Sequence, residues 1–240
     1  MASNRGRRGR PEVSIIIPTY NEVGSIGPLI EALEELARST PLELIVVDDG
    51  STDGTVEVVE ELARKYGNVR LLLRPSKMGL GSAYRDGLKL ARGDVVVQMD
   101  ADLSHRPSDL PSLLEALAEA DVVVGSRYVD GGSLMSWGFF RRLVSKVANL
   151  LAISVLRLDV RDATSGFRAW RREAFETCVR RARGNSYDFQ VETLCIAHRL
   201  GLRVREVPIT FVGRGRGSSK LGLRDVLSFL KNVLSLVRRP

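Results

Sequence analysis

The first half of the chain alternates short β-branched runs with longer segments in which apolar residues recur at helical spacing. Strands and helices in alternation predict a parallel sheet with helices on its faces. The predicted strands are 13–18, 42–47, 69–73, 94–99 and 122–124, and the predicted helices lie near 29–36, 55–66, 80–91 and 108–118. The expected fold is α/β, with a doubly wound, mostly parallel sheet whose ligands bind at the carboxyl ends of the strands.

The second half contains two segments with one apolar face and several cationic residues. In 134–157, residues at helical spacing are Trp137, Phe140, Val144, Val147 or Ala148, Leu151 and Val155, with Arg141, Arg142 and Lys146 close by. In 221–238, they are Leu223, Val226, Leu227, Leu230, Leu234 and Val237. One such helix would ordinarily pack on the core, but two favour helices that lie in a membrane interface, with partner recognition as the alternative. No run of about 18 apolar residues occurs, so no transmembrane helix is expected.

Charge is divided unevenly along the chain, although the net charge is +7. Residues 13–133 contain 11 Lys and Arg against 20 Asp and Glu, a net −9, whereas residues 134–240 contain 21 against 8, a net +13. This division indicates an anionic partner for the second half: nucleic acid, an anionic membrane or a phosphorylated substrate. A basic surface that is merely solvated is the alternative.

Cys178 and Cys195 suit free thiols in a reducing compartment, and with His198 they form no zinc pattern.

Carboxylates directly follow the second and fourth predicted strands. Asp48 and Asp49 come after the second, and Asp100 and Asp102 come after the fourth. Turn and helix-capping roles explain part of the first group, which leaves Asp49 as its ligand candidate. Oxygen ligands at this end of a parallel sheet suit a hard divalent cation that bridges the diphosphate oxygens of a substrate. The sequence therefore predicts a Mg²⁺ or Mn²⁺ site at Asp100 and Asp102.

A short basic segment, RGRGSSK at 214–220, places cations among glycines and serines. Glycines make such a loop flexible, and its Arg and Lys side chains can then wrap an anion. A solvated linker is one alternative and an RNA-binding loop is another, but RNA-binding surfaces usually add stacking aromatics, and none lies between Gly213 and Gly222. Capture of phosphate by Arg214 and Lys220 is the preferred interpretation.

Seven motifs follow one another between Pro18 and Lys220, within a stretch of resemblance that runs from Val13 to about Leu236. They are PTYNE at 18–22, VDDGSTDGT at 47–55, MDADLSH at 99–105, GSRY at 125–128, TSGFRA at 164–169, FQVE at 189–192 and RGRGSSK at 214–220. The first three together resemble the nucleotide-sugar domain of family-2 inverting glycosyltransferases, which have a GT-A type of fold. The later ones resemble the dolichyl-phosphate (polyprenyl-phosphate) mannosyltransferases within that family. Each motif alone is weak, but their order and spacing are specific.

The resemblance implies roles for individual residues. Contacts to the nucleobase and ribose are implied for Pro18, Tyr20, Glu22, Val47 and Asp49. The diphosphate and the metal would lie at Asp100, Ala101 and Asp102, with Asp102 the nearest ligand, and Ser104 stands where some relatives have Gln, so that its hydroxyl or a water would replace that ligand. Arg127 and Gln190 would line the sugar and acceptor side, and Arg214 and Lys220 would hold phosphate. Asp102, Arg214 and Lys220 are therefore the expected catalytic residues.

The activity implied by the resemblance is the transfer of mannose from GDP-mannose to dolichyl or another polyprenyl phosphate, with Mg²⁺ or Mn²⁺. The chain would act as a peripheral protein at the cytoplasmic face of a membrane, held by its own helices or by a separate membrane-anchoring subunit, and nucleic acid is not an expected partner. Residues 1–12 are expected to be a disordered basic arm, 13–133 a nucleotide-sugar-binding domain, and 134–240 an acceptor-binding part with two amphipathic interface helices.

Four other classes of protein were weighed. A polyprenyl-phosphate glucosyltransferase that uses UDP-glucose would share nearly all the motifs. A nucleotidyltransferase would have a basic, Gly-rich loop after its first strand, but 18–27 contains no basic residue. A processive polysaccharide synthase would have a Gln-x-x-Arg-Trp motif and membrane spans, which are absent. A basic RNA-binding protein would leave the acids at the strand ends unexplained.

The expected chemistry needs no dedicated general base. A phosphate monoester has a second pKa of about 6, so the acceptor is already largely the anionic nucleophile at neutral pH. The leaving nucleoside diphosphate needs charge neutralisation instead, which a metal at Asp102 with Arg214 and Lys220 would supply. A single in-line displacement with inversion is therefore expected. His105, in the loop after the metal site, and His198, on a predicted helix, are not catalytic candidates.

Overall fold

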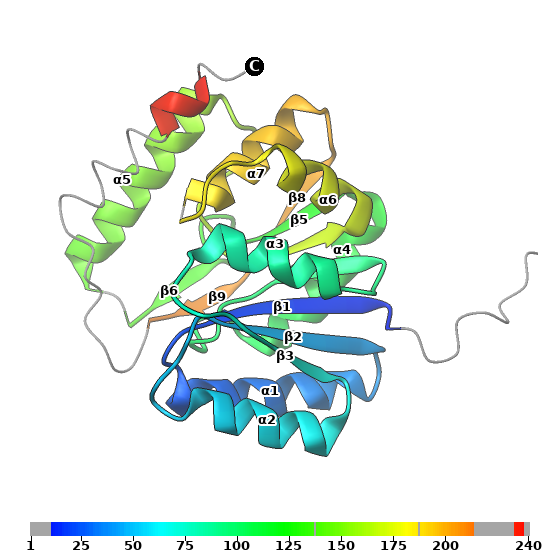
Figure 1. The fold of residues 1–240 in the computed structure, drawn as a ribbon. Helices are drawn as coiled ribbons and strands as arrows, with labels where there is room; N and C mark the ends of the chain where they lie inside the picture. Colours follow the sequence, from blue (N-terminus) through cyan, green and yellow to red (C-terminus); the bar gives the residue numbers. More distant parts are fainter. Residues whose placement is uncertain (1–10, 137, 187, 214–232, 238–240) are drawn as a thin grey trace, which may run out of the picture.

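The computed structural model describes residues 11–136, 138–186, 188–213 and 233–237, and its centre is a seven-stranded sheet (Figure 1). The strand order is β3-β2-β1-β4-β7-β5-β8, and every neighbouring pair is parallel except those made by β7. The strands are β1 Val13–Thr19, β2 Leu42–Asp48, β3 Val69–Leu73, β4 Val95–Gln98, β5 Val122–Ser126, β7 Arg168–Arg171 and β8 Val204–Pro208. The predicted α/β fold with a mostly parallel sheet is confirmed. The sequence pattern did not reveal β7 and β8.

Helices cover both faces of the sheet. One face packs against α1 Val23–Ala37, α2 Thr55–Tyr66 and α4 Leu110–Ala116, with single 3₁₀ turns at Pro107–Asp109 and Leu117–Glu119. The other packs against α3 Leu80–Leu90, α6 Arg172–Arg181 and α7 Asp188–Arg199. The helix α5 Phe139–Leu156 stands at one side of this layered body, above a small parallel sheet of β6 Ser133–Met135 and β9 Thr210–Val212 (Figure 1).

The continuous apolar runs of the first strands explain why the sheet is covered on both faces. In β1, Ile15 and Ile17 belong to the core beneath α1 and α2, whereas Ile16 belongs to the core beneath α3. The neighbouring strand β2 is buried in the same way: Val46 belongs to the core beneath α1 and α2, and Val47 belongs to the core beneath α3. Successive side chains of a strand point to opposite faces, so an uninterrupted apolar strand predicts this double burial.

The part of the chain after residue 133 shares the sheet with the part before it. β7 pairs with β4 and β5, and β8 pairs with β5. The fully buried Trp170 of β7 donates its indole N–H to Oε1 of Gln98 on β4 at 2.9 Å. Residues 13–133 and 134–240 are therefore packed around common cores, and the division at 133 remains a prediction about roles.

Most of the amphipathic segment 134–157 forms the predicted helix, as α5, but Leu134 and Met135 belong to strand β6 and Trp137 lies outside the described residues. The apolar residues of α5 are exposed along one side, including Phe139, Leu143, Val147 and Leu150, whereas Ala152 and Leu156 pack into the core. Most of the segment 221–238 lies outside the described residues; 233–237 is helical, with Val233 and Leu236 buried and Leu234 and Val237 exposed. Among the described residues, no helix combines the length and hydrophobicity that crossing a membrane requires.

The two cysteines are free and buried, as expected for thiols that form no disulfide. Burial raises the pKa of Cys178 to about 12, which keeps this thiol protonated and unreactive at neutral pH.

Candidate active site

The loops that follow β1 and β2 are joined by hydrogen bonds at the carboxyl edge of the sheet. Asn21, in a left-handed conformation at φ 56°, donates its backbone N–H to Ser51 Oγ at 2.8 Å and accepts the Thr52 N–H on Oδ1 at 2.9 Å. The Glu22 N–H reaches Thr55 Oγ1 at 2.9 Å. The motif at 18–22 is therefore held against the loop of the motif at 47–55.

The two acids after β2 have different partners. Asp48 accepts the Gly50 and Ser51 backbone N–H groups at 3.0 and 2.8 Å, so its carboxylate shapes the turn. Asp49 pairs with the buried Arg74, whose Nε lies 2.6 Å from Oδ1, and its Oδ2 accepts the Met78 N–H at 3.2 Å. Arg74, just after β3, orients the predicted ligand Asp49. Sequence reasoning missed it because nothing local marks a pair separated by 25 residues.

The other residues assigned to the nucleobase and ribose differ in exposure. Tyr20 is 43% exposed, and Lys77 Nζ lies 4.8 Å from the centre of its ring. Pro18 is partly buried, and Glu22 accepts the Ser25 hydroxyl on Oε2 at 2.9 Å. The Val47 side chain is fully buried in the core beneath α3. The exposed aromatic ring of Tyr20 is thus the surface on which a base can stack here.

The predicted metal-binding residues form a tight loop after β4. Asp102 Oδ1 accepts the Ser104 N–H at 3.0 Å and also the Ser104 hydroxyl. Leu103 takes a left-handed conformation at φ 60°, and Ala101 and Ser104 are buried. Asp100 keeps 36% of its side chain exposed. Because β4 pairs with β1, which also pairs with β2, these carboxylates lie at the same edge as the two loops described above.

His105 supports this loop from inside the protein. Its ring stacks on Phe167 at 5.1 Å and meets Phe211 edge-on at 5.4 Å. Burial lowers its pKa, against the opposing effect of the Asp100 and Asp102 charges. Nδ1 accepts the Asp100 N–H at 3.3 Å, which places the proton of the neutral ring on Nε2, 3.9 Å from Asp100 Oδ2.

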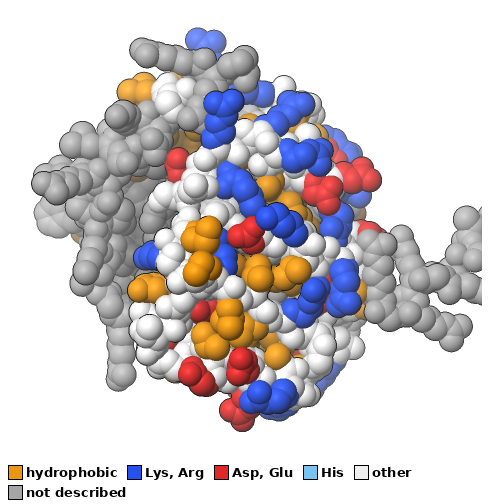
Figure 2. All heavy atoms as spheres, viewed as in Figure 1, with side chains coloured by type: hydrophobic (Ala, Val, Ile, Leu, Met, Phe, Trp, Pro, Cys, Tyr) orange, Lys and Arg blue, Asp and Glu red, His pale blue; other side chains and the backbone are white. Residues whose placement is uncertain are grey.

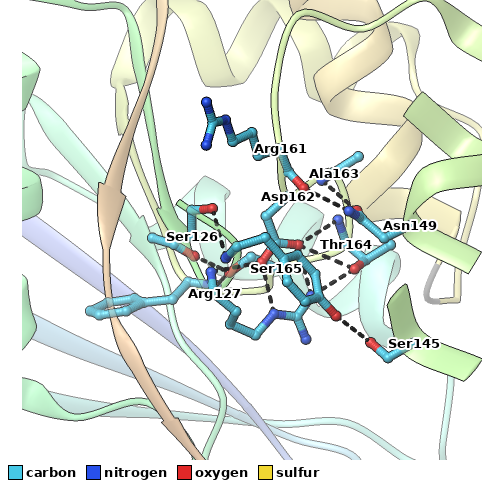
Figure 3. A network of polar contacts seen from close by, with 12 residues as sticks. Ser126, Arg127, Ser145, Asn149, Arg161, Asp162, Ala163, Thr164 and Ser165 are labelled. Carbon is cyan, nitrogen blue, oxygen red and sulfur yellow. Dashed lines mark hydrogen bonds and ion pairs between the residues drawn. The ribbon is translucent and has the colours of Figure 1, made fainter. Parts of the chain in front are cut away.

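Arg127, at the end of β5, makes a buried ion pair with Asp162 (Figure 3). Its Nε and Nη2 donate to the two oxygens of Asp162 at 2.7 Å each, and Nη2 also reaches Thr164 Oγ1 at 2.6 Å. Burial alone would raise the pKa of Asp162, but the adjacent guanidinium outweighs it and the pKa is lowered. Among the described residues, Arg127 Nη1 makes no hydrogen bond, so one edge of the guanidinium keeps its donors for another group.

The segment 161–166 is held from three sides and ends against the metal loop. Besides Arg127, Glu206 of β8 accepts the Arg161 and Asp162 N–H groups at 2.6 and 2.8 Å. Asn149 of α5 donates to the Arg161 carbonyl at 2.6 Å and accepts the Ala163 N–H at 2.9 Å (Figure 3). A Cβ on Gly166 would lie 3.2 Å from Asp100 Oδ2, a tight contact, so the backbone of the segment passes close to the Asp100 carboxylate. Sequence reasoning noted the motif at 164–169 but missed its supports, Asp162, Glu206 and Asn149.

Gln190, assigned to the sugar and acceptor side, is buried on α7 beside two other polar side chains. Arg168 donates to the Gln190 carbonyl at 2.5 Å and to the Ala163 carbonyl at 2.8 Å. The Gln190 amide and the Tyr84 hydroxyl lie near each other but complete no hydrogen bond of normal geometry within the described chain. Complete burial raises the pKa of Tyr84 well above its usual value, and the Asp100 charge reinforces this effect.

Arg214 and Lys220, the predicted phosphate ligands, lie outside the described residues. The chain leaves the described part at Gly213, whose N–H bonds to the Met135 carbonyl at 2.9 Å. One residue earlier, the Val212 N–H bonds to the Ser104 carbonyl at 2.9 Å. The strand β9 therefore ends beside the loop that carries Asp102.

Comparison with known proteins identifies the family to which the chain belongs. Residues 14–179 match the model of the family described as Glycosyl transferase family 2, so the chain belongs to glycosyltransferase family 2. It is 38% identical over 231 residues to dolichol-phosphate mannosyltransferase of Pyrococcus furiosus, covering 95% of this chain and 64% of that longer protein. It is 42% identical over 213 residues to undecaprenyl-phosphate mannosyltransferase of Micrococcus luteus, covering 87% of each. Polyprenol monophosphomannose synthase of Mycolicibacterium smegmatis is 42% identical over 214 residues, covering 86% of this chain and 80% of that protein.

Solved structures share the fold. Glucosyl-3-phosphoglycerate synthase from Mycobacterium tuberculosis, in complex with Mn²⁺, UDP and glucosyl-3-phosphoglycerate, superposes with a TM-score of 0.70 at 24% identity. The match covers 97% of this chain and 82% of that one. The GT-A type of architecture expected from the sequence is thereby confirmed.

Proposed function

We propose that the protein transfers mannose from GDP-mannose to dolichyl or another polyprenyl phosphate, with inversion and with the help of a divalent cation. The observation that carries the proposal is the position of Asp100 and Asp102 at the carboxyl end of β4, beside the joined loops of β1 and β2. The names of three relatives at 38–42% identity support both the sugar and the class of acceptor.

The donor nucleotide would bind across the joined loops. Tyr20 would stack on the base, Pro18 and Glu22 would contact the base and ribose, and Asp49 would accept from the base. Arg74 engages Oδ1 of Asp49 through both Nε and Nη2, and the Met78 N–H engages Oδ2, whose second lone pair can still accept a base N–H. Because its side chain is buried, Val47 would contribute only backbone atoms.

A divalent cation fits the residues of the loop after β4. Among the described residues, no group of three or more His, Cys, Asp or Glu side chains could hold a metal by itself. Asp100 and Asp102 supply two carboxylates, and the Ser104 hydroxyl donates to Asp102. Such a set suits Mg²⁺ or Mn²⁺, which are commonly held by one or two carboxylates together with waters and substrate phosphates. When bound, the cation would neutralise charge on the leaving diphosphate.

The protein's own residues would place the sugar and the acceptor phosphate. Arg127 offers its unengaged guanidinium edge, and the buried Gln190 amide, which lacks a partner among the described residues, would hydrogen-bond a sugar hydroxyl. Arg214 and Lys220, outside the described residues, would hold phosphate oxygens. The acceptor phosphate, already ionised, would attack without a dedicated base.

We also propose that the protein acts peripherally at the cytoplasmic face of a membrane. The exposed apolar side of α5 supports this location, with Arg142 and Lys146 exposed on the same helix. A separate membrane-anchoring subunit would strengthen the attachment.

A transfer assay tests the proposal. Purified protein is incubated with radiolabelled GDP-mannose or UDP-glucose and dolichyl phosphate, with Mn²⁺, Mg²⁺ or chelator. We expect lipid-linked mannose from GDP-mannose only, and none with chelator. Asp102→Ala is expected to abolish transfer while the protein stays folded, and Asp159→Ala, which changes an exposed acid, serves as the matched control. Transfer from UDP-glucose alone would establish a glucosyltransferase instead, and near-normal turnover by Asp102→Ala in excess metal would refute the metal assignment.

A further inference from the structure

The inner side of α5 makes polar contacts through two residues: the Ser145 hydroxyl lies 3.0 Å from the Tyr128 hydroxyl, and Asn149 binds backbone groups with both ends of its amide. Asn149 is 1% exposed and lies between the buried or partly buried Ala148, Ala152 and Ile153. Its Nδ2 donates to the Arg161 carbonyl at 2.6 Å and its Oδ1 accepts the Ala163 N–H at 2.9 Å (Figure 3). Both ends of the side chain thus bind the backbone of one short segment, and a shift of the helix would leave these buried groups unpaired.

The segment that Asn149 binds is also held by groups outside α5. Arg127 binds the Asp162 carboxylate through both of its oxygens, and Glu206 binds two backbone N–H groups of the segment. Its far end, Gly166, lies against Asp100. The segment 161–166 therefore connects the carboxylates of the metal loop to α5, the helix with the exposed apolar side.

We propose that Asn149 is a positioning residue that sets the rotation and height of α5 relative to the reacting groups, so that a polyprenyl phosphate held in lipid reaches the donor sugar. This inference rests on the proposed function. A helix turns about 100° per residue, so a slip by one residue would turn the apolar side away from the membrane. A buried Asn fixes the register of helices in coiled coils on the same physical basis.

The contribution of Asn149 should appear only when the acceptor is presented by the membrane. An acceptor whose chain stays in the bilayer reaches the site at a height set by α5, and a misplacement of about 1 Å can lower a rate by about 100-fold. A short, water-soluble prenyl phosphate diffuses to the site freely. Because Arg127 and Glu206 still hold the segment 161–166, the metal loop should keep its shape in the absence of the Asn149 side chain.

The experiment compares Asn149→Ala with Ser154→Ala, which removes an exposed hydroxyl from the same helix. Each variant is assayed with a long polyprenyl phosphate in liposomes and with a short soluble prenyl phosphate. For Asn149→Ala we expect kcat to fall about 10- to 100-fold with the long acceptor and less than about threefold with the short one. The KM for GDP-mannose and binding to liposomes should be unchanged. Ser154→Ala should match the wild type.

Two further measurements separate positioning from simple destabilisation. Amide hydrogen exchange in 143–156, measured without substrates, should quicken in Asn149→Ala and not in Ser154→Ala. If Asn149→Ala does not fold, Asn149→Asp keeps the shape and the acceptor for the Ala163 N–H while losing the donor. Equal losses on both acceptors, or unchanged exchange in α5, would overturn the inference. If the wild type transfers no sugar to any polyprenyl phosphate, the proposed function fails, while the exchange result still reports on the contact.

Discussion

At the scale of single residues, breaking the buried pair of Arg127 and Asp162 should destabilise the protein strongly. Both side chains are almost entirely buried, and Asp162 also accepts two backbone N–H groups, from Arg127 at 3.0 Å and from Thr164 at 3.2 Å. Removing one partner of a buried pair leaves an uncompensated charge, at a cost of about 3–5 kcal/mol. We expect Asp162→Asn to lower the free energy of unfolding by about that amount at pH 7. Urea titration of both proteins measures it.

The same pair predicts a pH dependence with a definite sign. The pKa of Asp162 is lowered in the folded protein, so its contribution is complete above the unfolded pKa of about 4 and is lost as the pH falls through the folded value. The difference in stability between the wild type and Asp162→Asn should therefore be constant from pH 5 to 7 and shrink below about pH 4. A difference that stays constant to pH 2 would contradict the assignment.

Part of the candidate site could be predicted residue by residue. Acids directly after an apolar strand must lie at the ligand edge of a parallel sheet, which is why Asp100 and Asp102 could be placed from the sequence. The residues that support them could not be predicted. Asp162 and Glu206 have no distinguishing pattern in the sequence, and their role becomes visible only once β5 pairs with β8. Long-range pairing of this kind leaves no local pattern.

At the scale of elements, the start of α3 depends on a close approach of two backbones. Gly79 has φ +95°, and a Cβ there would overlap the carbonyl oxygen of Asn185. That carbonyl accepts the Gly81 N–H at 3.1 Å, and Arg85 Nη1 donates to Asn185 Oδ1 at 2.6 Å. We expect Gly79→Ala to cost more than about 2 kcal/mol of stability, from strain and overlap together.

Gly24→Ala in α1 is the matched control, because a Cβ at Gly24 meets nothing within 4 Å. Alanine is the better helix former, so this change should leave stability unchanged or raise it by up to about 1 kcal/mol. Thermal unfolding of the two variants gives the comparison. If the Gly79→Ala protein is as stable as Gly24→Ala, the backbone at Asn185 can move away from the added Cβ at little cost in stability.

The elements that the pattern predicts and those that it misses differ in composition. The early strands are β-branched and apolar, and each was placed within one or two residues. By contrast, β7 consists of Arg168, Ala169, Trp170 and Arg171, in which Arg168 is fully buried. Its charge is accommodated by the carbonyls of Gln190 and Ala163. Burial lowers the pKa of Arg168 to about 10, which leaves it charged at neutral pH, and no rule of apolar periodicity anticipates such a strand.

At the scale of the whole molecule, the uneven charge of the sequence becomes an uneven surface. Lys and Arg side chains gather over the region of α6 and α7, with some Asp and Glu among them, and the end covered by α1 and α2 carries acidic and basic side chains together (Figure 2). Several of the cations are paired, such as Arg205 with Glu119 at 2.5 Å and Arg203 with Asp121 at 3.1 Å. Both pairs join a cation of the second half to an acid of the first half, so they offset part of the surplus positive charge that the sequence places in 134–240.

The exposed side of α5 gives the prediction that tests how the whole molecule meets a membrane. Leu143, Val147 and Leu150 are 46–51% exposed and follow one another at helical spacing. Each buried methylene contributes about 0.8 kcal/mol to membrane binding, so changing all three to Ser should greatly weaken binding to anionic liposomes. The free energy of unfolding should change little, since these side chains are largely outside the core.

Transfer to a long polyprenyl phosphate should fall with liposome binding in this triple variant, and transfer to a short soluble acceptor should survive. Leu73→Ser is the control, because Leu73 is exposed to a similar degree, 56%, on the edge strand β3 and outside α5. The result is the complement of Asn149→Ala, which is expected to lose transfer to the long acceptor with liposome binding intact. If the triple variant binds liposomes like the wild type, α5 is not the element that meets the lipid, and the predicted segment 221–238 and the positively charged surface become the candidates.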